Sequence, residues 1–442
     1  MPQLPLLLRL QPRLPLQPRL PLHSRRLRLR ALPLRSAARV PKGHPRPGVP
    51  RAEARRKRSS WHSPNAVAAA PASSPGEVSR LSSAVLSGRD ASRAAVAGLL
   101  GLVAVGAVFS WRSSPPSSVA GSRLCDRYAS AGGSDRSSGT RHKPFRTVAR
   151  LARSLRPGQT GCLIGELVED QVIIRRGGRP GAPIRLRSLP GTRATLRGRL
   201  TIGPNASDVV VAWLNLDGRN SIGGASPTVL GDRAVFRNND VTNASTEICF
   251  ILGSLNRGYV AEGTVIEGNR IHDCGKLPPQ NRDHGIYLEY ARDTRIVSNY
   301  IYDNADRGIQ LYPDADRTLI ANNVIDGNGE GIIFSGSGSL ASDENTVRDN
   351  VVANSAVRYN VEYYYAPGSA TGTGNLVTRN CLWGGAQGDI LGDGIAFAAS
   401  DNIVADPLYV DRQGKDFRLR PESPCAHAQP LRPPPRVETT SR

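Results

Sequence analysis

The sequence contains few aromatic residues and, between residues 161 and 408, no run with the pattern of an amphipathic helix. Aromatic residues make up 5% of the 442 residues, whereas glycine is common, with 45 residues. Parallel strands in one open sheet need long crossovers, which are usually helical, so the absence of helical runs argues against such a sheet. The composition favours a domain in which tight turns recur and the interior holds small or β-branched side chains.

What the sequence does contain is a short motif that recurs six times between residues 235 and 382. Each copy is an asparagine, any residue and an aliphatic residue, and the copies begin 30, 30, 24, 27 and 30 residues apart. Self-similarity at such a period indicates a stack of repeated units. We expect the asparagines to occupy one turn position in every coil and to form a ladder of amide hydrogen bonds. They are Asn239, Asn269, Asn299, Asn323, Asn350 and Asn380.

A second motif, glycine followed by alternating apolar residues, starts at Gly285, Gly308 and Gly331, each 23 residues after the last. A coil of this length that holds only strands and turns can pair with the coils above and below it, which predicts an all-β, single-stranded parallel β-helix of about ten coils. The interior would take every second side chain. The expected interior residues are Ile286, Leu288, Ile309, Leu311, Ile332, Phe334, Val361 and Tyr363.

The two ends of this region carry further patterns. Val148, Leu151 and Leu155 predict a short amphipathic helix, which could cap the open end of a solenoid. Tyr128-Ala129-Ser130 stands before it, and Asp416-Phe417-Arg418-Leu419 closes the region. Together these segments resemble the entry and exit of right-handed parallel β-helix proteins, the superfamily of pectate-lyase-like polysaccharide lyases, hydrolases and epimerases. The resemblance covers about residues 125 to 428 and implies a right-handed coil.

The positive charge of the chain is concentrated in a leader. Residues 1–93 hold 19 Lys plus Arg and 3 Asp plus Glu, which leaves a net charge of +5 for the other 349 residues. We interpret this Leu-, Pro- and Arg-rich leader as disordered, either an overextended reading frame or an electrostatic arm for nucleic acid or a membrane. The rest of the chain lacks a basic stripe, so we expect no nucleic acid to bind the folded domain.

A candidate export segment follows the leader at residues 94–120. Its apolar part, residues 94–109, is of marginal length for a spanning helix, and small residues at Ser118 and Ala120 match a cleavage site before Gly121. The segment is therefore either a signal peptide or a membrane anchor, and the protein is expected to be extracellular. Residues 121–160 would form the cap, residues 161–428 the β-helix and residues 429–442 a disordered tail. We expect a monomer.

Six cysteines make an even set for an oxidising compartment, and their spacing does not suit a zinc site. One disulfide would tie the cap to the first coil, one would join neighbouring coils and one would close the last turn. The alternative, above all for the middle pair, is buried free thiols. The expected pairs are Cys125 with Cys162, Cys249 with Cys274, and Cys381 with Cys425.

In-phase side chains of successive coils would form columns with a spacing of about 5 Å. If successive coils are aligned on the glycine motif, His284 lies over Arg307, and Arg307 lies over Glu330, with Asp283 and Asp306 beside them. Residues 276–282 and 314–316 are expected to be loop insertions that border this face. Two more outward columns are expected, one of Tyr287, Gln310, Ile333 and Glu362, the other of Glu289, Tyr312, Ser335 and Tyr364.

Two reactions on an acidic polysaccharide suit this cluster. In an elimination, His284 or Tyr287 would act as base or acid and Arg307 would pair with the sugar carboxylate. Asp283 and Asp306 would orient the imidazole or bind Ca²⁺, the one cofactor considered. Hydrolysis needs two carboxyl groups at about 5 to 9.5 Å, which Asp283, Asp306, Glu289 or Glu330 would supply. The residues expected to bind the polysaccharide are Glu289, Gln310, Tyr312, Glu330, Glu362 and Tyr364.

The sequence departs from the catalytic patterns of the superfamily it resembles. After the leader the only lysines are Lys143, Lys276 and Lys415, whereas lyases of the alginate and chondroitin type use a lysine and arginine pair. The segment Asp283-His284-Gly285-Ile286-Tyr287 resembles only part of the epimerase pattern. The sequence thus predicts a lyase or hydrolase of an acidic polysaccharide. The alternative is a non-catalytic glycan-binding or structural protein, in which His284 belongs to a capping turn.

Overall fold

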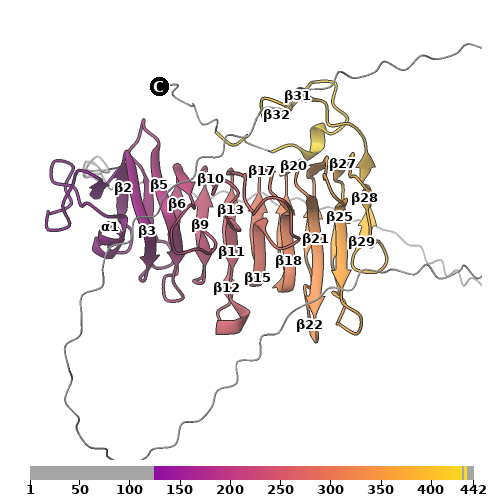
Figure 1. The fold of residues 1–442 in the computed structure, drawn as a ribbon, viewed down its shortest axis with the longest axis horizontal. Helices are drawn as coiled ribbons and strands as arrows, with labels where there is room; N and C mark the ends of the chain where they lie inside the picture. The colour runs from indigo at the N-terminus through magenta and orange to yellow at the C-terminus, as the bar shows by residue number, and fades with distance from the viewer. Residues whose placement is uncertain (1–123, 431–432, 436–442) are drawn as a thin grey trace, which may run out of the picture. The chain divides into compact units, whose positions relative to one another are not determined.

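The computed structural model describes residues 124–430 and 433–435. These residues form a right-handed parallel β-solenoid of about nine turns, with its axis horizontal in Figure 1, which confirms the all-β fold expected from the repeats. The leader, the candidate export segment and the last residues of the tail lie outside the described residues. Within the described residues, no helix is long and apolar enough to cross a membrane.

One face of the solenoid is an eleven-stranded parallel sheet, here called the first sheet. Its strands are hydrogen-bonded in chain order, each to the strand one winding further on. They are β1 (Arg127–Ser130), β2 (Thr160–Ile164), β4 (Ile184–Ser188), β6 (Val209–Ala212), β9 (Val235–Arg237), β13 (Val265–Glu267), β16 (Arg295–Val297), β19 (Leu319–Ala321), β23 (Thr346–Arg348), β26 (Leu376–Thr378) and β29 (Ala398–Ser400).

The other two faces of the solenoid belong to one nineteen-stranded sheet, in which the strands pair along two separate series, one for each face. The second face begins at the recurring asparagines and consists of β7 (Leu214–Asp217), β10 (Asp240–Thr242), β14 (Arg270–His272), β17 (Tyr300–Tyr302), β20 (Val324–Asp326), β24 (Val351–Ala353), β27 (Cys381–Trp383) and β30 (Ile403–Val404). The third face consists of β8 (Thr228–Val229), β11 (Phe250–Leu252), β15 (His284–Arg292), β18 (Arg307–Asp316), β21 (Glu330–Ser337), β25 (Tyr359–Tyr365) and β28 (Gly388–Ile390). The long strands β3 (Glu166–Ile174) and β5 (Ala194–Ile202) join the two faces, because β5 pairs with both β7 and β8. Two short strands, β12 (Ala261–Glu262) and β22 (Leu340–Ala341), pair with β15 and β21.

The glycine motif is explained by close approach between coils. A Cβ atom on Gly331 would lie 2.1 Å from the carbonyl oxygen of Asn360, and one on Gly308 would lie 2.9 Å from that of Gly331. Only glycine therefore fits where the third face begins. The interior positions that follow these glycines are buried as predicted, and Tyr363 packs partly buried against the same core.

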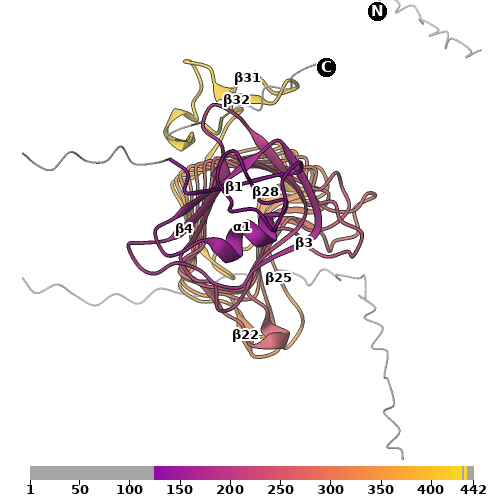
Figure 2. The ribbon, with the colours of Figure 1, turned by 90° about the vertical axis from the view of Figure 1, so that its left-hand side faces the viewer.

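A short helix covers the open end of the solenoid, as expected for the cap. Helix α1 (Val148–Ser154) lies across this end in Figure 2, which looks along the axis. Thr147 is its N-cap, and the Thr147 Oγ1 atom accepts a hydrogen bond from the backbone N–H of Arg150 at 3.1 Å. Val148 and Leu151 are fully buried in the main core, so the helix shields apolar side chains that would otherwise face water.

The predicted asparagine ladder is present, and it continues one coil further to Asn402. In each rung the Oδ1 atom accepts hydrogen bonds from the backbone N–H and the Nδ2 of the asparagine one coil earlier. The Nδ2 atom of Asn323, for example, donates to Asn350 Oδ1 at 2.9 Å and to the Ile296 carbonyl at 2.8 Å. A second, shorter ladder, in which Asn304 Nδ2 donates to Asn328 Oδ1 at 2.8 Å, was not predicted.

All three predicted disulfides are present, including the middle pair for which free thiols were the alternative. They join Cys125 to Cys162, Cys249 to Cys274 and Cys381 to Cys425. No free cysteine occurs in the part of the chain that the structure describes. Such a set of bonds fits an extracellular protein.

The chain returns over the second face after its last coil. We call residues 405–430 the C-terminal strap; it contains the antiparallel pair β31 (Tyr409–Asp411) and β32 (Asp416–Leu419), visible at the top of Figure 1. Phe417 is fully buried there against the rings of Tyr300, Tyr302 and Tyr409, in a second apolar cluster. The strap also contains the turn η2 (Ala426–Ala428), and a turn η1 (Leu255–Arg257) follows β11.

One local expectation was wrong. Residues 314–316, predicted as a loop insertion, lie in β18, where they pair with Tyr290, Ala291 and Arg292 after a shift of register. Arg292 lies 2.5 Å from Asp314 and 3.1 Å from Asp316, so the two carboxylates are held by a cation from the neighbouring coil. The strand continues because this ion pairing offsets the repulsion between them.

Candidate functional site

Two of the three predicted columns on the third face are present, whereas the third, from Glu289 to Tyr364, is in register only at Ser335 and Tyr364, because the register of β15 and β18 shifts at Glu289. His284 is paired with Arg307 in the strand register, and Arg307 is paired with Glu330. The next outward column likewise runs from Tyr287 to Gln310 to Ile333 to Glu362. Beside the first column, the backbone N–H of Asp306 donates to the carbonyl of Asp283 at 3.2 Å. The repeat period therefore places these side chains correctly.

Four charged side chains at this end of the face form what we call the arginine-glutamate cluster: Arg307, Glu330, Arg358 and Glu362. Arg307 Nε donates to Glu330 Oε2 at 2.6 Å, and both side chains are less than a tenth exposed. Arg358 Nε donates to Glu362 Oε2 at 2.9 Å and lies 3.8 Å from Glu330 Oε1. A single guanidinium thus lies between two buried carboxyl groups that belong to neighbouring coils.

Glu362 is the most perturbed carboxyl group of this cluster. Its side chain has no exposed surface, and its carboxyl group lies within hydrogen-bonding reach of the carboxyl group of Glu330. Burial and, after it, the negative charge of Glu330 raise the pKa of Glu362 to about 7, even though Arg358 acts in the opposite direction. At neutral pH a large fraction of Glu362 is therefore protonated and can donate a proton.

A cleft of about 340 Å³ opens beside the cluster. Glu330 and Arg358 line one side of it, and Pro279, Gln280 and Asn281 line another. These last residues belong to the predicted 276–282 insertion, which does border the candidate site. Asn281 accepts hydrogen bonds from the Arg307 guanidinium through its side-chain and main-chain oxygens, so the insertion is tied to the cluster.

His284 and Tyr287, predicted as acid or base, both lie on β15. His284 is 3% exposed, and its Nδ1 atom has no hydrogen-bond partner. Burial, followed by the nearby charge of Arg307, lowers the pKa of His284 well below its usual value, so the imidazole is neutral at pH 7. The Tyr287 ring lies edge-on at 5.5 Å between ring centroids, and burial raises the pKa of its hydroxyl.

Asp283 and Asp306 are engaged by backbone N–H groups. Asp306 Oδ2 accepts hydrogen bonds from Arg282 at 2.6 Å and from Asp283 at 2.7 Å, while Asp283 Oδ2 accepts one from Lys276 at 2.9 Å. These bonds fix the insertion. Calcium needs six to eight oxygen ligands, and no group of three His, Cys, Asp or Glu side chains among residues 124–430 and 433–435 could hold a metal. Asp283 and Asp306 therefore do not fit the Ca²⁺ site that was considered for them.

The residues predicted to bind the polysaccharide differ in how far their side chains are exposed to solvent. Tyr364 is 53% exposed, and the rings of Tyr287 and Tyr312 stack at 6.4 Å between centroids. Gln310 is buried. Glu289 accepts a hydrogen bond from the backbone N–H of Leu255 at 3.2 Å, and its burial raises its pKa.

The role of Arg358 was missed in the sequence. This residue lies in the segment between β24 and β25, where the repeat gives no register, so nothing in its position predicts its contacts. Its spacing from Glu362, four residues with opposite charge, is the one signal that could have indicated the pair.

Comparisons with known proteins agree with the fold. Residues 221–406 match the family model described as a right handed beta helix region, which confirms the right-handed β-helix expected from the sequence. A search of curated proteins finds no match. Similar solved structures include pectate lyase Pel9A, with 13% identity and a TM-score of 0.47 over 67% of this chain and 90% of that one. A rhamnogalacturonan lyase has 12% identity and a TM-score of 0.46 over 70% and 95%, and a GH136 lacto-N-biosidase from Eubacterium ramulus has 13% and 0.39 over 62% and 67%.

Proposed function

We propose that this chain is an exported glycoside hydrolase that cleaves a polysaccharide at the arginine-glutamate cluster. The observation that carries the proposal is the position of Arg358 between two buried carboxyl groups with different environments. Glu330 is ion-paired with Arg307, whereas Glu362 has a pKa raised to about 7. Pairs of carboxyl groups whose environments differ in this way divide the acid and base roles of glycoside hydrolysis.

In this mechanism Glu362 is the general acid. It would protonate the glycosidic oxygen as the bond to the sugar breaks, so that the leaving group departs as a neutral alcohol. Glu330 is the second carboxyl group. As a carboxylate held by Arg307, it would attack the anomeric carbon or activate a water molecule. Both roles need carboxyl groups about 5 to 9.5 Å apart, whereas Glu330 and Glu362 are close enough to share a hydrogen bond, so the entering sugar would have to separate them.

Access to Glu362 depends on Arg358. The Arg358 side chain is 37% exposed and lines the cleft, while Glu362 has no exposed surface. A sugar that enters the cleft would displace the Arg358 guanidinium from Glu362. This displacement also removes a cation that lowers the pKa of Glu362, so substrate entry would favour the protonated acid.

We favour hydrolysis over elimination because Arg307, the arginine predicted to pair with a sugar carboxylate, is already paired within the cluster. Arg307 is paired with Glu330 and Arg358 with Glu362. Arg307 could neutralise a sugar carboxylate only by leaving the buried carboxylate of Glu330, and such a separation of a buried ion pair is costly. His284 as a base and Arg307 as the group that binds the sugar carboxylate remain proposals for a lyase.

A non-catalytic glycan-binding protein is the second candidate. The stacked rings of Tyr287 and Tyr312 and the exposed Tyr364 favour it, because aromatic faces bind the apolar faces of sugar rings. The complete burial of Glu362 is also compatible with a structural role. Export is supported in either case by the three disulfides.

The test is an activity screen of the full chain against acidic and neutral polysaccharides. A hydrolase releases reducing ends without an ultraviolet-absorbing unsaturated product, whereas a lyase yields that product. Glu362→Gln should lower kcat by a factor of about 100 or more, as expected for loss of a general acid. Glu262→Gln, at an exposed position on β12, is the matched control and should leave kcat unchanged.

Three outcomes would contradict the proposal. The first is an unsaturated product, which would identify a lyase. The second is full activity in both Glu362→Gln and Glu330→Gln when the variants melt at the wild-type temperature. The third is binding of a polysaccharide without any cleavage, which would favour the glycan-binding protein.

A further inference from the structure

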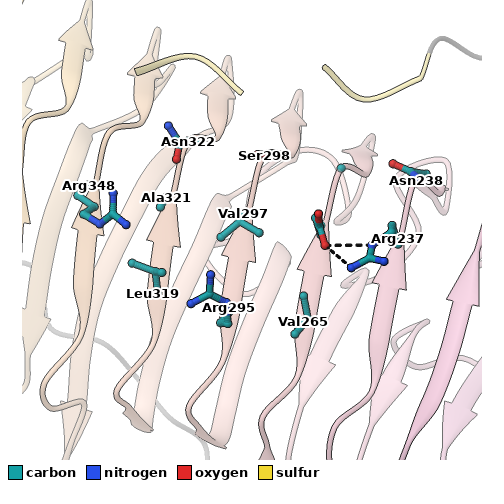
Figure 3. Close-up of a pocket in the computed structure, with 12 residues that line it drawn as sticks. Arg237, Asn238, Val265, Arg295, Val297, Ser298, Leu319, Ala321, Asn322 and Arg348 are labelled. Carbon is teal, nitrogen blue, oxygen red and sulfur yellow. Dashed lines mark hydrogen bonds and ion pairs between the residues drawn. The ribbon is translucent and has the colours of Figure 1, made fainter. Parts of the chain in front are cut away.

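The first sheet carries a groove on its outer surface, away from the third face. The groove has a volume of about 500 Å³ and is shown in Figure 3. Its floor consists of short apolar side chains from three successive strands: Val265 from β13, Val297 from β16, and Leu319 and Ala321 from β19. We call this hollow the arginine groove, because Arg237, Arg295 and Arg348 also line it.

These arginines are spaced along the solenoid. They come from β9, β16 and β23, so two coils separate each from the next, or about 10 Å along the axis. Arg237 is bonded to Glu267, the one acidic residue that lines the groove, with Nε–Oε2 and Nη2–Oε2 distances of 3.0 and 2.6 Å. Arg348 contacts Asp349 through one nitrogen. The Arg295 side chain is exposed and makes no ion pair or hydrogen bond with the described residues.

A row of turn residues forms one edge of the groove. The residue before each ladder asparagine has a positive φ in seven successive coils, from Asn238 at 56° to Asp401 at 55°. This backbone conformation brings Asn238, Ser298 and Asn322 to the upper ends of the strands in Figure 3. Their amide and hydroxyl groups can donate and accept hydrogen bonds at regular intervals. A second hollow continues beyond Asn322 and Arg348 towards Arg379, Asp349 and Asp401.

We propose that the arginine groove binds an extended acidic oligosaccharide at a site separate from the arginine-glutamate cluster. Three guanidinium groups against two carboxylates, Glu267 and Asp349, favour an anionic ligand, and the unpaired guanidinium of Arg295 can bind a sugar carboxylate. The apolar floor suits sugar C–H groups, while the polar edge suits hydroxyl groups. A single-stranded nucleic acid fits less well, because no aromatic residue lines the groove for base stacking.

Such a site would hold a polymer against the solenoid while another part of it reaches the third face. The proposal does not depend on hydrolysis at Glu362, since a glycan-binding protein could use the same groove. All binding is measured with chains that carry Glu362→Gln, so that hydrolysis at the arginine-glutamate cluster does not cleave the oligosaccharide during the measurement. A loss of binding at the arginine groove can then be distinguished from an absence of hydrolytic activity at Glu362.

The probe is a hexamer of galacturonic acid, titrated into the full chain by calorimetry. The neutral control is the same hexamer with its carboxyl groups methyl-esterified. We expect Arg295→Gln and Arg348→Gln each to weaken binding of the acidic hexamer about tenfold. Arg187→Gln is the matched control, because Arg187 lies on the same outer face two strands before Arg237 and outside the groove. It should bind like the parent. The basic leader contributes equally to every variant, so the comparison isolates the groove.

A variant that fills the groove without changing charge tests the same site. Val297→Trp should weaken binding of the hexamer by a similar factor while the chain keeps its oligomeric state and melting temperature. Equal binding by all variants would overturn the proposal. Equal affinity for the acidic and the esterified hexamer would also overturn it, as would tighter binding of single-stranded DNA through Arg295. The same holds if measurement of the oligomeric state shows that Val297→Trp disrupts an association between two copies of the chain.

Discussion

The Nε atom of Arg358 lies 2.9 Å from the Oε2 atom of Glu362, a side chain with no exposed surface. This contact predicts the pH dependence of activity. If Glu362 is the general acid, it must be protonated, and its pKa is raised to about 7. The rate constant kcat/KM should therefore fall as the pH rises above about 7. Arg358→Gln removes an interaction that lowers this pKa, so the decline should move to higher pH. A decline centred below pH 6, or one that Arg358→Gln does not move, would contradict the assignment.

A charged histidine on the second face predicts a pH-dependent stability. His272 lies between two carboxylates, with Nδ1 at 2.7 Å from Asp273 and Nε2 at 3.3 Å from Asp240. Burial lowers its pKa, but the hydrogen bonds to both carboxylates outweigh burial and raise the pKa to about 9. The charged form thus stabilises the fold fully below pH 6.5, and this contribution is lost as the pH rises through 9.

The expected loss is about 3 kcal/mol of unfolding free energy between pH 6 and pH 9.5. Urea unfolding at the two pH values would measure it, with His272→Gln as the comparison, because that variant cannot titrate. A wild-type chain that loses no more stability than His272→Gln over this interval would show that the two carboxylates do not hold a charged imidazole.

The asparagine ladder predicts a gradient of stability along the repeat. Asn323 makes hydrogen bonds to both neighbouring coils, whereas Asn402 ends the ladder and donates only to the Val377 carbonyl. Asn323→Ala leaves buried backbone and amide groups unpaired in two coils and should cost about 3 kcal/mol or more. Asn402→Ala should cost roughly half as much. Equal losses in chemical denaturation would mean that the rungs act independently of their position.

Much of this fold could be predicted because a solenoid converts sequence period into spatial neighbours. Once the coil length is known, His284, Arg307 and Glu330 must lie in one column, and the strand register agrees. The middle disulfide followed from the same reasoning, since Cys249 and Cys274 lie 25 residues apart, about one coil. The ladder was also predicted, except for Asn402, which lies outside the span where the motif was counted.

The features that were not predicted depend on segments without a repeat. Arg358 lies between two strands, and its contacts to Glu330 and Glu362 are set by the local path of the backbone. The burial of His284 and Glu362 was also not predicted, because an outward position in a column does not reveal what covers it. The strap is a similar case, since its contacts join residues up to 145 positions apart, as between Arg270 and Lys415.

The strap should open without unfolding the solenoid when its apolar anchor is removed. Phe417 is fully buried against the rings of Tyr300, Tyr302 and Tyr409, and its truncation to alanine would cost about 3 to 5 kcal/mol if the site cannot collapse. The coils beneath keep their ladder and inter-strand bonds, so the loss should be local. Hydrogen exchange should show protection lost in residues 409–419 of Phe417→Ala and retained in β17 and β20. Phe397→Ala, which removes a ring that packs on Phe334 in the main core, is the control and should leave the strap protected. Loss of protection throughout the solenoid in Phe417→Ala would show that the strap and the coils unfold as one unit.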